Sequence, residues 1–145
     1  MFDSKKKIKF EIVTQEKVVL KEMILQVTVP TEEGEITVLP NHTPLIANLE
    51  PGIIELKKED KTIEIMSLSG GFIEVLRNKI VILADTAERA DEIDEKRAQE
   101  ARKKAEESLK DLRQFDNKRF ANISSMIAKE LARTRAVIRW KKLKR

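Results

Sequence analysis

Apolar and polar side chains alternate along the N-terminal part of the chain. Ile8, Phe10 and Ile12 alternate with Lys9 and Glu11. A period of two places one set of side chains on a buried face and the other in water, which predicts a β-strand. Further short apolar runs occupy residues 17–20, 23–29, 36–39, 45–47, 53–57, 62–66, 72–76 and 80–84. Strands this short and closely spaced predict a β-sandwich or flattened barrel over residues 1–85.

Proline and glycine punctuate this region. All four prolines and two of the four glycines lie within residues 29–56, between short apolar runs. Proline lacks an N–H and fixes φ, so it favours strand ends, edges and turns. Gly70-Gly71 lacks the following Lys and Ser/Thr of a phosphate-binding loop. The pair therefore predicts a turn or bulge before the next strand.

The hydrophobic period changes after Asp85 and Thr86, both candidate N-caps for a helix. A stripe with spacings of three and four runs through Ala90, Ile93, Ala98 or Arg97, Ala101, Ala105, Leu109 and Leu112. A second stripe runs through Phe120, Ile123, Ile127, Leu131, Thr134 and Ile138. Both stripes predict helices. Asp116 or Asn117 is the candidate cap of the second helix. Residues 86–145 are therefore predicted to form an antiparallel helical hairpin.

A hairpin of two helices buries little apolar area by itself. It needs support from the β domain or from another protein. Its position is therefore expected to be switchable.

Charge is distributed unevenly along the chain. Residues 1–85 carry 11 Lys/Arg and 14 Asp/Glu, whereas residues 117–145 carry 10 Lys/Arg and one acid, Glu130. This excess is larger than a helix C-terminus requires and predicts an acidic partner, either a protein or a nucleic acid. Trp140 is the only aromatic residue after Phe120, so stacking on bases has little support.

Candidate chemistry is sparse. His42 is the only histidine, and the chain has no cysteine and no tyrosine. A lone histidine in a turn is more often an interface residue than a general base. No His cluster accompanies the acids to complete a metal site. No apolar run approaches the ~20 residues of a membrane span, and the N-terminus does not have the pattern of a signal peptide. We therefore expect a chain that is not itself an enzyme and that meets a membrane only through a partner.

Residues 93–98 have two interpretations. On a helix, Asp94 and Arg97 are neighbours at i,i+3, and such an exposed ion pair contributes about 0.2–0.5 kcal/mol. In this interpretation Ile93 and Ala98 are packing residues beside a solvated pair. The other interpretation is a functional motif, and it depends on the following resemblance.

The runs EGEITVLPNHTPLIANLEPG (33–52), LSGGFIEV (68–75) and NKIVILADTAERADEID (78–94) resemble the epsilon subunit of bacterial F-type ATP synthases. The resemblance implies a non-catalytic rotor subunit of the central stalk, peripheral to the cytoplasmic side of the bacterial cell membrane. Its β domain would bind the gamma subunit near His42 and face the membrane c-ring with Glu33 and Glu35. Its hairpin would extend into the alpha/beta catalytic head and inhibit ATP hydrolysis. Arg133, Arg135 and Arg139 would then meet acidic C-terminal segments of the beta subunits.

The resemblance requires no cofactor but implies a regulatory ATP site in some members. Those members bind ATP between the two helices through an I/L-D-x-x-R-A motif. By this likeness Asp94 would face the ribose or adenine, Arg97 the phosphates, and Ile93 and Ala98 the base. Glu88 matches a family position, Arg133 and Arg135 are candidates from the second helix, and Lys104 stands where binders have arginine. The alternatives are a passive stalk adaptor or a nucleic-acid-binding module.

Overall fold

Nine strands form one continuous sheet in the computed structural model, which describes residues 6–111 and 117–144. The strands are β1 (Ile8–Val13), β2 (Val18–Thr31), β3 (Gly34–Val38), β4 (Leu45–Leu49), β5 (Gly52–Lys58), β6 (Ile63–Leu68), β7 (Gly71–Val75), β8 (Lys79–Ala84) and β9 (Ala87–Arg89). A 3₁₀ helix η1 (Ala90–Glu92) and two α-helices, α1 (Glu95–Lys110) and α2 (Asn117–Leu143), follow. The predicted class, strands first and a helical hairpin afterwards, is confirmed.

The long strand β2 joins the two layers of the sandwich. It pairs with β1 through its first half, with β5 through its middle, and with β3 and β4 through its end. The prediction of separate strands at 17–20 and 23–29 was therefore wrong. Lys21 and Glu22 continue the ladder opposite β1, and the bend comes instead from a register shift between Ile24 and Gln26.

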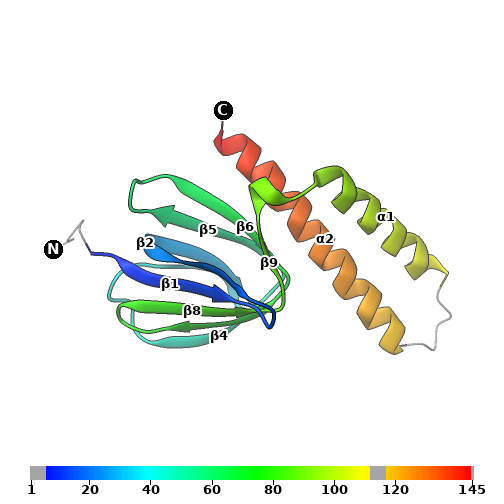
Figure 1. Cartoon of the computed structure of the whole chain (residues 1–145). Coiled ribbons are helices and arrows are strands. Elements are labelled where there is room, and N and C mark those ends of the chain that lie inside the picture. The colour runs from blue at the N-terminus through cyan, green and yellow to red at the C-terminus, as the bar shows by residue number, and fades with distance from the viewer. Residues whose placement is uncertain (1–5, 112–116, 145) are drawn as a thin grey trace.

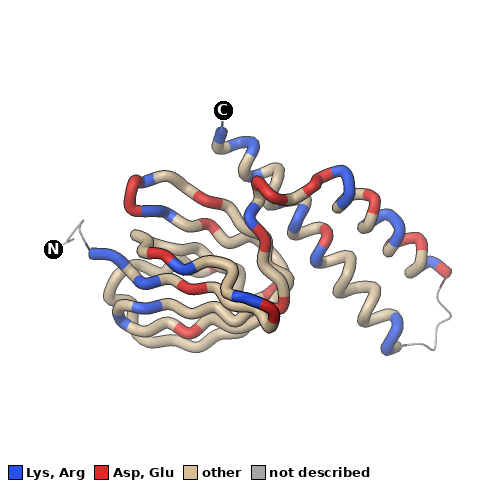
Figure 2. Tube along the Cα trace, viewed as in Figure 1, with Lys and Arg blue, Asp and Glu red and all other residues tan. Residues whose placement is uncertain are grey.

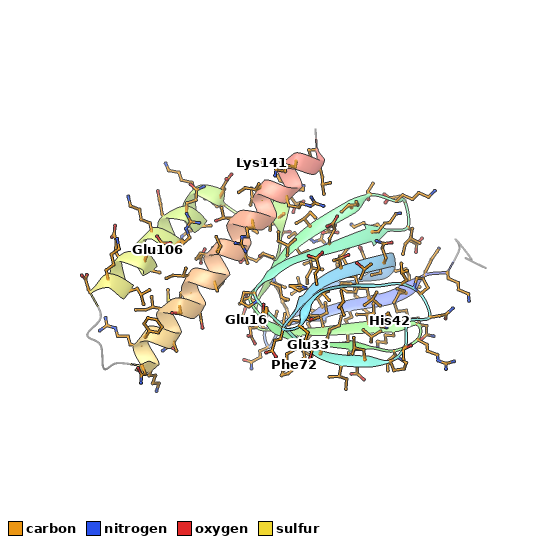
Figure 3. All side chains as sticks on the ribbon, turned by 180° about the vertical axis from the view of Figure 1, so that it is seen from behind. Glu16, Glu33, His42, Phe72, Glu106 and Lys141 are labelled. Atoms are coloured by element: carbon orange, nitrogen blue, oxygen red, sulfur yellow. The ribbon has the colours of Figure 1, made fainter. Side chains whose placement is uncertain are left out.

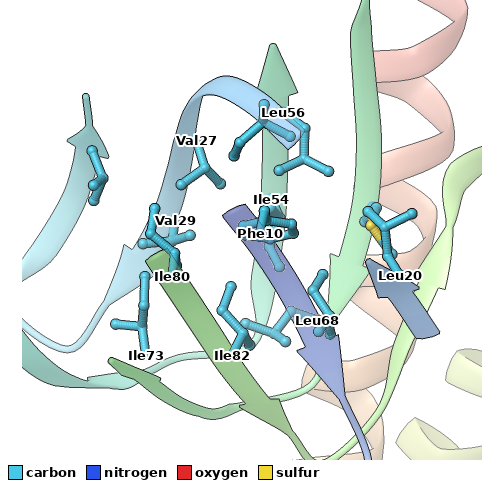
Figure 4. Packing of buried hydrophobic residues seen from close by; sticks show 14 of the residues in the cluster. Phe10, Leu20, Val27, Val29, Ile54, Leu56, Leu68, Ile73, Ile80 and Ile82 are labelled. Atoms are coloured by element: carbon cyan, nitrogen blue, oxygen red, sulfur yellow. The ribbon is translucent and has the colours of Figure 1, made fainter. Parts of the chain in front are cut away.

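The barrel closes where β1 pairs with β2 on one side and in parallel with β8 on the other. The alternating residues of β1 then point inward, and Phe10 and Ile12 are fully buried. Figure 4 shows Phe10 among Ile54, Ile80 and Ile82, which come from both layers. The period-two pattern therefore identified the core face of this strand correctly.

Gly70 lies in the turn between β6 and β7, and Gly71 is the first residue of β7, so the predicted turn before a strand is confirmed. Their φ angles are +126° and +142°, which side chains with a Cβ rarely adopt. A Cβ on Gly71 would also overlap the backbone of Leu83. The pair is therefore required by chain geometry, because β7 and β8 approach closely here.

The sheet continues past residue 85, because β9 adds to the edge of β6. Asp85 donates its backbone N–H to Gly70, and Thr86 bonds to Ser69, so neither residue caps a helix. The prediction that one of them is the N-cap was wrong. The cap of α1 is Asp94, whose carboxylate accepts the backbone N–H of Arg97. The ladder to β6 satisfies the backbone groups that a helix start would have left free.

The two helices pack as an antiparallel hairpin, with α2 between α1 and the sandwich (Figure 1). On α1, the predicted positions Ala98 and Ala105 are buried. On α2, Ile123 and Thr134 are buried, but Phe120 is 54% exposed and Ile138 43% exposed. Part of the predicted stripe was therefore wrong. The other buried residues of α2 are Glu130, Ala132, Ala136 and Val137.

The physical reason is that α2 has two neighbours. A single stripe of spacing three and four describes one contact face, whereas this helix packs on α1 and on the sheet at once. Leu112 of the first stripe and the candidate cap Asp116 lie outside the described residues, and Asn117 is the first residue of α2.

Candidate functional site

The hairpin meets the sandwich through a small apolar contact, which we call the docking cluster. Its buried members are Ile65 of β6, Ala90 of η1, Ile93, and Ala136 and Val137 of α2. Ile53 and Trp140 pack against it while partly exposed. The cluster is separate from the sandwich core, and two of its five buried residues are alanines. Little apolar area therefore holds the hairpin in place, because burial free energy scales with apolar area.

Arg133 lies beside the docking cluster between two carboxylates. Its Nε is 3.2 Å from Oε1 of Glu88 on β9, and its Nη1 is 2.9 Å from Oε2 of Glu130 on the same helix. The side chains of Arg133 and Glu130 are only 20% and 12% exposed. A partly buried ion pair is screened less by salt than an exposed one. This group therefore ties α2 to the edge of the sheet.

Two further ion pairs involve the C-terminal half of α2. Arg139 Nη2 is 3.4 Å from Oε2 of Glu55 on β5, and Lys141 Nζ is 2.6 Å from Oε2 of Glu95 at the start of α1. Figure 2 shows Lys and Arg gathered at the C-terminal end of α2. The Arg139 pair crosses from the hairpin to the sandwich, whereas the Lys141 pair stays within the hairpin.

The 93–98 motif occupies the start of α1. Asp94 is its N-cap, and Ile93 and Ala98 are buried, at 9% and 0% exposed. Arg97 is exposed, and its guanidinium has no hydrogen-bond or ion-pair partner among the described residues. The Asp94–Arg97 contact is therefore a helix cap and not the side-chain ion pair considered from the sequence.

The structure brings together part of the ATP set. Glu88 and Arg133 are in direct contact, and Ile93 belongs to the docking cluster next to Ala136 and Val137. Arg97 and Arg135 are exposed and without a carboxylate partner among the described residues. Each guanidinium could bind phosphate oxygens, but no contact among the described residues brings Arg97 and Arg135 together. Ile93 and Ala98 are already covered, so a base would reach them only if the helices separate.

The three candidate partner residues on the sandwich lie at the two ends of β3. Glu33 and Glu35 are exposed at the turn between β2 and β3, and His42 follows the other end of β3. Figure 3 shows Glu33 and His42 well apart on the sandwich. The His42 Nδ1 atom is 2.6 Å from the backbone oxygen of Thr43, so the imidazole is tied to its own turn. This arrangement supplies two separate surfaces and brings no catalytic set together.

An exposed apolar patch covers the outer face of β4, β7 and β8. Phe72 lies directly opposite Leu83 across the β7–β8 ladder, and Ile46 lies on the adjoining strand β4. Their exposed fractions are 53%, 55% and 75%. Adjacent exposed apolar residues of this size indicate an interaction surface. Alternation in each strand could have found them, because they are the apolar residues at outward positions.

Several residues of the site were not predicted from the sequence. Glu55 on β5 pairs with Arg139 of the basic helix, Glu130 pairs with Arg133 within that helix, and Ala136 and Trp140 belong to its contact with the sheet. Glu130 carried a signal, because it is the only acid in 117–145. Glu55 carried no such signal. Its partner Arg139 lies 84 positions further along the chain, and the two residues meet only because the hairpin docks on the sandwich.

Two properties of the described residues bear on the class of protein. No group of three or more His, Cys, Asp or Glu side chains among residues 6–111 and 117–144 is placed to hold a metal ion. Neither helix in this part of the chain is long and apolar enough to cross a membrane.

Known proteins are similar to this chain in sequence and in fold. Residues 7–90 match the family described as "ATP synthase, Delta/Epsilon chain, beta-sandwich domain". The "ATP synthase epsilon chain" of Herpetosiphon aurantiacus is 50% identical over 104 residues, which cover 72% of this chain and 76% of the relative. The protein of the same name from Carboxydothermus hydrogenoformans is 52% identical over 103 residues, which cover 71% of this chain and 76% of the relative.

Solved structures agree with the fold. A chain of the Euglena gracilis mitochondrial ATP synthase superposes with a TM-score of 0.76 at 23% identity, covering 90% of this chain and 81% of that chain. A chain of the Tetrahymena thermophila mitochondrial ATP synthase superposes with a TM-score of 0.60 at 18% identity, covering 91% and 98%.

The sandwich and its family match place the molecule in the delta/epsilon class of ATP synthase chains. Within that class, the curated relatives that are about half identical to this chain are epsilon chains. The chain belongs to the ATP synthase epsilon chain family.

Proposed function

We propose that this chain is a central-stalk rotor subunit of an F-type ATP synthase and a brake on its ATP hydrolysis. In this proposal the sandwich holds the gamma subunit on the membrane c-ring and transmits torque. The hairpin permits rotation while docked and blocks hydrolysis when it extends into the alpha/beta head. The complex keeps the chain peripheral to the cytoplasmic side of the bacterial membrane, and catalysis belongs to other subunits.

The observation that carries the brake is the docking cluster. A contact of two alanines, a valine and two isoleucines, with a few ion pairs around it, is small enough to open. An element whose docked and released states differ by a few kcal/mol responds to partners and ligands. The sandwich has its own core and does not depend on the hairpin for it. The two parts can therefore separate without unfolding the sandwich.

The surfaces of the sandwich support a role in binding neighbours. The apolar patch Ile46, Phe72 and Leu83 suits a protein partner, for which we propose gamma. We propose the turn of His42, at the other end of β4 from Phe72, as a further contact of the same partner. Glu33 and Glu35, at the far end of β3, suit the polar loops of the ring. The turn of His42 and the acidic turn lie at opposite ends of β3, which fits a subunit that joins two neighbours.

Regulatory ATP forms the second part of the proposal. Arg97 and Arg135 would hold the phosphates while Arg133 stays paired with Glu88 beside them, and Asp94 would face the ribose or adenine. A ligand bound only to the docked hairpin stabilises that state by RT ln(1 + [L]/Kd), which is about 2.7 kcal/mol at a hundredfold excess over Kd. ATP would then oppose inhibition when it is abundant.

Truncation of the hairpin tests the brake. We expect removal of residues 94–145 to raise ATP hydrolysis by the assembled enzyme several-fold, while ion pumping stays coupled to hydrolysis. The cut follows Ile93, so β9 and its ladder to β6 remain. Unchanged hydrolysis would favour the passive stalk adaptor. Tight DNA or RNA binding by the full chain, with a steep salt dependence, would favour the nucleic-acid alternative.

A thermal shift tests the ATP site. Millimolar ATP should raise the Tm of the isolated chain, and Arg97→Ala should abolish this rise. Lys96→Ala is the matched control, because Lys96 is an exposed cation in the same helical turn. If ATP does not change the Tm of the wild-type chain, nucleotide binding is excluded. The proposal that the hairpin inhibits hydrolysis does not depend on this result.

A further inference from the structure

The hairpin carries the basic residues proposed to meet an acidic partner, yet some of them already contact carboxylates of this chain. Arg133 lies against Glu88 and Arg139 against Glu55, both on strands of the sandwich. Arg135, between them on the same helix, is exposed and has no carboxylate partner among the described residues. The basic helix therefore presents two kinds of arginine in the docked state.

Undocking affects these contacts differently. The pairs of Arg133 with Glu88 and of Arg139 with Glu55 must break, because their carboxylates stay on the sandwich. The pairs of Arg133 with Glu130 and of Lys141 with Glu95 persist, because both members belong to the hairpin. Release of the hairpin therefore leaves Arg139 without Glu55. Arg133 keeps Glu130 but loses Glu88, whose place is taken by solvent.

We propose that Glu55 and Glu88 are an internal acidic partner that masks Arg133 and Arg139 until the hairpin leaves the sandwich. Acidic protein segments and the sandwich then compete for the same two guanidinium groups. Docking would thus hold the helix away from its target and also neutralise the charges that recognise it. The inference rests on the proposed function, since it concerns how the brake is kept off.

The geometry favours a real competition over a chance surface pairing. Arg133 is only 20% exposed, so an outside carboxylate has little access to it while Glu88 is in place. Arg139 is 48% exposed and its contact with Glu55 is longer, so its masking is the weaker of the two. Both contacts sit beside the docking cluster, and a partner that takes either arginine must oppose that contact.

Binding of poly-L-glutamate to the isolated full-length chain at low ionic strength, without nucleotide, tests the proposal. We expect Glu55→Gln/Glu88→Gln to bind this probe about fivefold more tightly than wild type, because two ion pairs that compete with it are lost. Glu59→Gln/Glu74→Gln is the matched control, because it also removes two carboxylates from the sandwich. Glu59 pairs with Lys7 within the sandwich, so its loss removes a carboxylate without touching the hairpin.

A second test substitutes the arginines of α2 in two backgrounds, one with the wild-type sandwich and one with the two glutamine substitutions. In the wild-type background Arg135→Gln should weaken poly-L-glutamate binding, whereas Arg133→Gln should change it little. In the Glu55→Gln/Glu88→Gln background both substitutions should weaken binding. The difference between backgrounds measures the coupling of Arg133 to Glu88, the one of the two glutamates that it contacts.

Equal binding by wild type and the double glutamine variant, with Arg133→Gln as harmful as Arg135→Gln in both backgrounds, would overturn the masking. An equal gain in Glu59→Gln/Glu74→Gln would also overturn it, because net charge alone would then explain the effect. These outcomes are separate from failure of the brake, which truncation of the assembled enzyme reports.

Discussion

Gly71 shows how a single residue sets the spacing of two strands. Its φ of +142° lies where a side chain is strained, and a Cβ there would overlap the Leu83 carbonyl. Gly34 also has a positive φ, +122°, but nothing lies within 4 Å of the Cβ it would gain. A side chain at Gly34 would therefore meet backbone strain alone, whereas a side chain at Gly71 would meet both strain and steric overlap.

Substitution by alanine should reveal this difference. We expect Gly71→Ala to destabilise the protein by about 3–5 kcal/mol, since strain and overlap add, and Gly34→Ala by about 1–2 kcal/mol from strain alone. Urea unfolding measures both free energies. Equal losses would mean that β7 and β8 can move apart at no cost.

Asp60 shapes the turn between β5 and β6. Its Oδ1 accepts the Thr62 hydroxyl at 2.6 Å and the Thr62 backbone N–H at 3.0 Å. The hydroxyl bond, followed by the backbone bond, lowers the pKa of Asp60 below its ordinary value of 3.8. A carboxyl with a lowered folded pKa contributes stability above its unfolded pKa and loses it as pH falls through the folded one.

This sign gives a pH prediction. Asp60→Asn should have a lower Tm than wild type at neutral pH, and the difference should shrink as pH falls below 3.8. The effect should be small, because the side chain is exposed. Thermal unfolding of both proteins across acidic pH provides the measurement, and a difference that is constant with pH would contradict it.

At the scale of elements, α2 packs against two neighbours, α1 and the sheet, through different residues. Ala136 is fully buried at the contact with the sheet. Small side chains let the helix approach β6 closely, but they contribute little apolar area. A tight fit with little burial makes the contact easy to disrupt by added volume.

Ala136→Leu should therefore undock the hairpin while the sandwich stays folded. Overpacking of a buried site costs about 1–3 kcal/mol, which is comparable to a contact of this size. Trp140, the only tryptophan, packs against the docking cluster, so its emission should shift to the red and acrylamide should quench it more. Ala121→Leu, at an exposed position of α2, should leave the emission unchanged.

At the scale of the whole molecule, charge separates along the chain. Glu55 and Glu88 of the sandwich pair with arginines of α2 beside the docking cluster. Lys142 and Lys144, at the C-terminal end of α2, are exposed. Attraction between exposed charges extends about 30 Å at 0.01 M salt but only about 8 Å at 0.15 M. An inhibitory contact that uses these cations should therefore weaken with salt.

Arg135→Glu in the assembled enzyme should relieve inhibition of ATP hydrolysis, and more strongly at low than at high ionic strength. Arg135 is suited to this test because it has no ion-pair partner in residues 6–111 and 117–144. Lys118→Glu, at the opposite end of α2, is the control. Inhibition that responds equally to both reversals would assign the effect to net charge.

Local signals predicted the parts of the fold that depend on short-range physics. Alternation in β1, the turn at Gly70-Gly71 and the alanine positions of α1 follow from side-chain period and backbone geometry. The errors fell where a distant segment competed for the same groups. Asp85 and Thr86 carry the signature of a helix cap, but Gly70 and Ser69 take their backbone bonds.

The amino-acid sequence by itself determined a β domain followed by two helices, and the basic end of the second helix. Only the tertiary structure decided that α2 turns Ala136 and Val137 to the sheet and that Glu55 and Glu88 meet its arginines. The period of a helix records which residues are apolar, but it does not record which of two neighbours each face will meet. Ion pairs between residues far apart in the chain depend on how the hairpin docks, and docking is a property of the assembled fold.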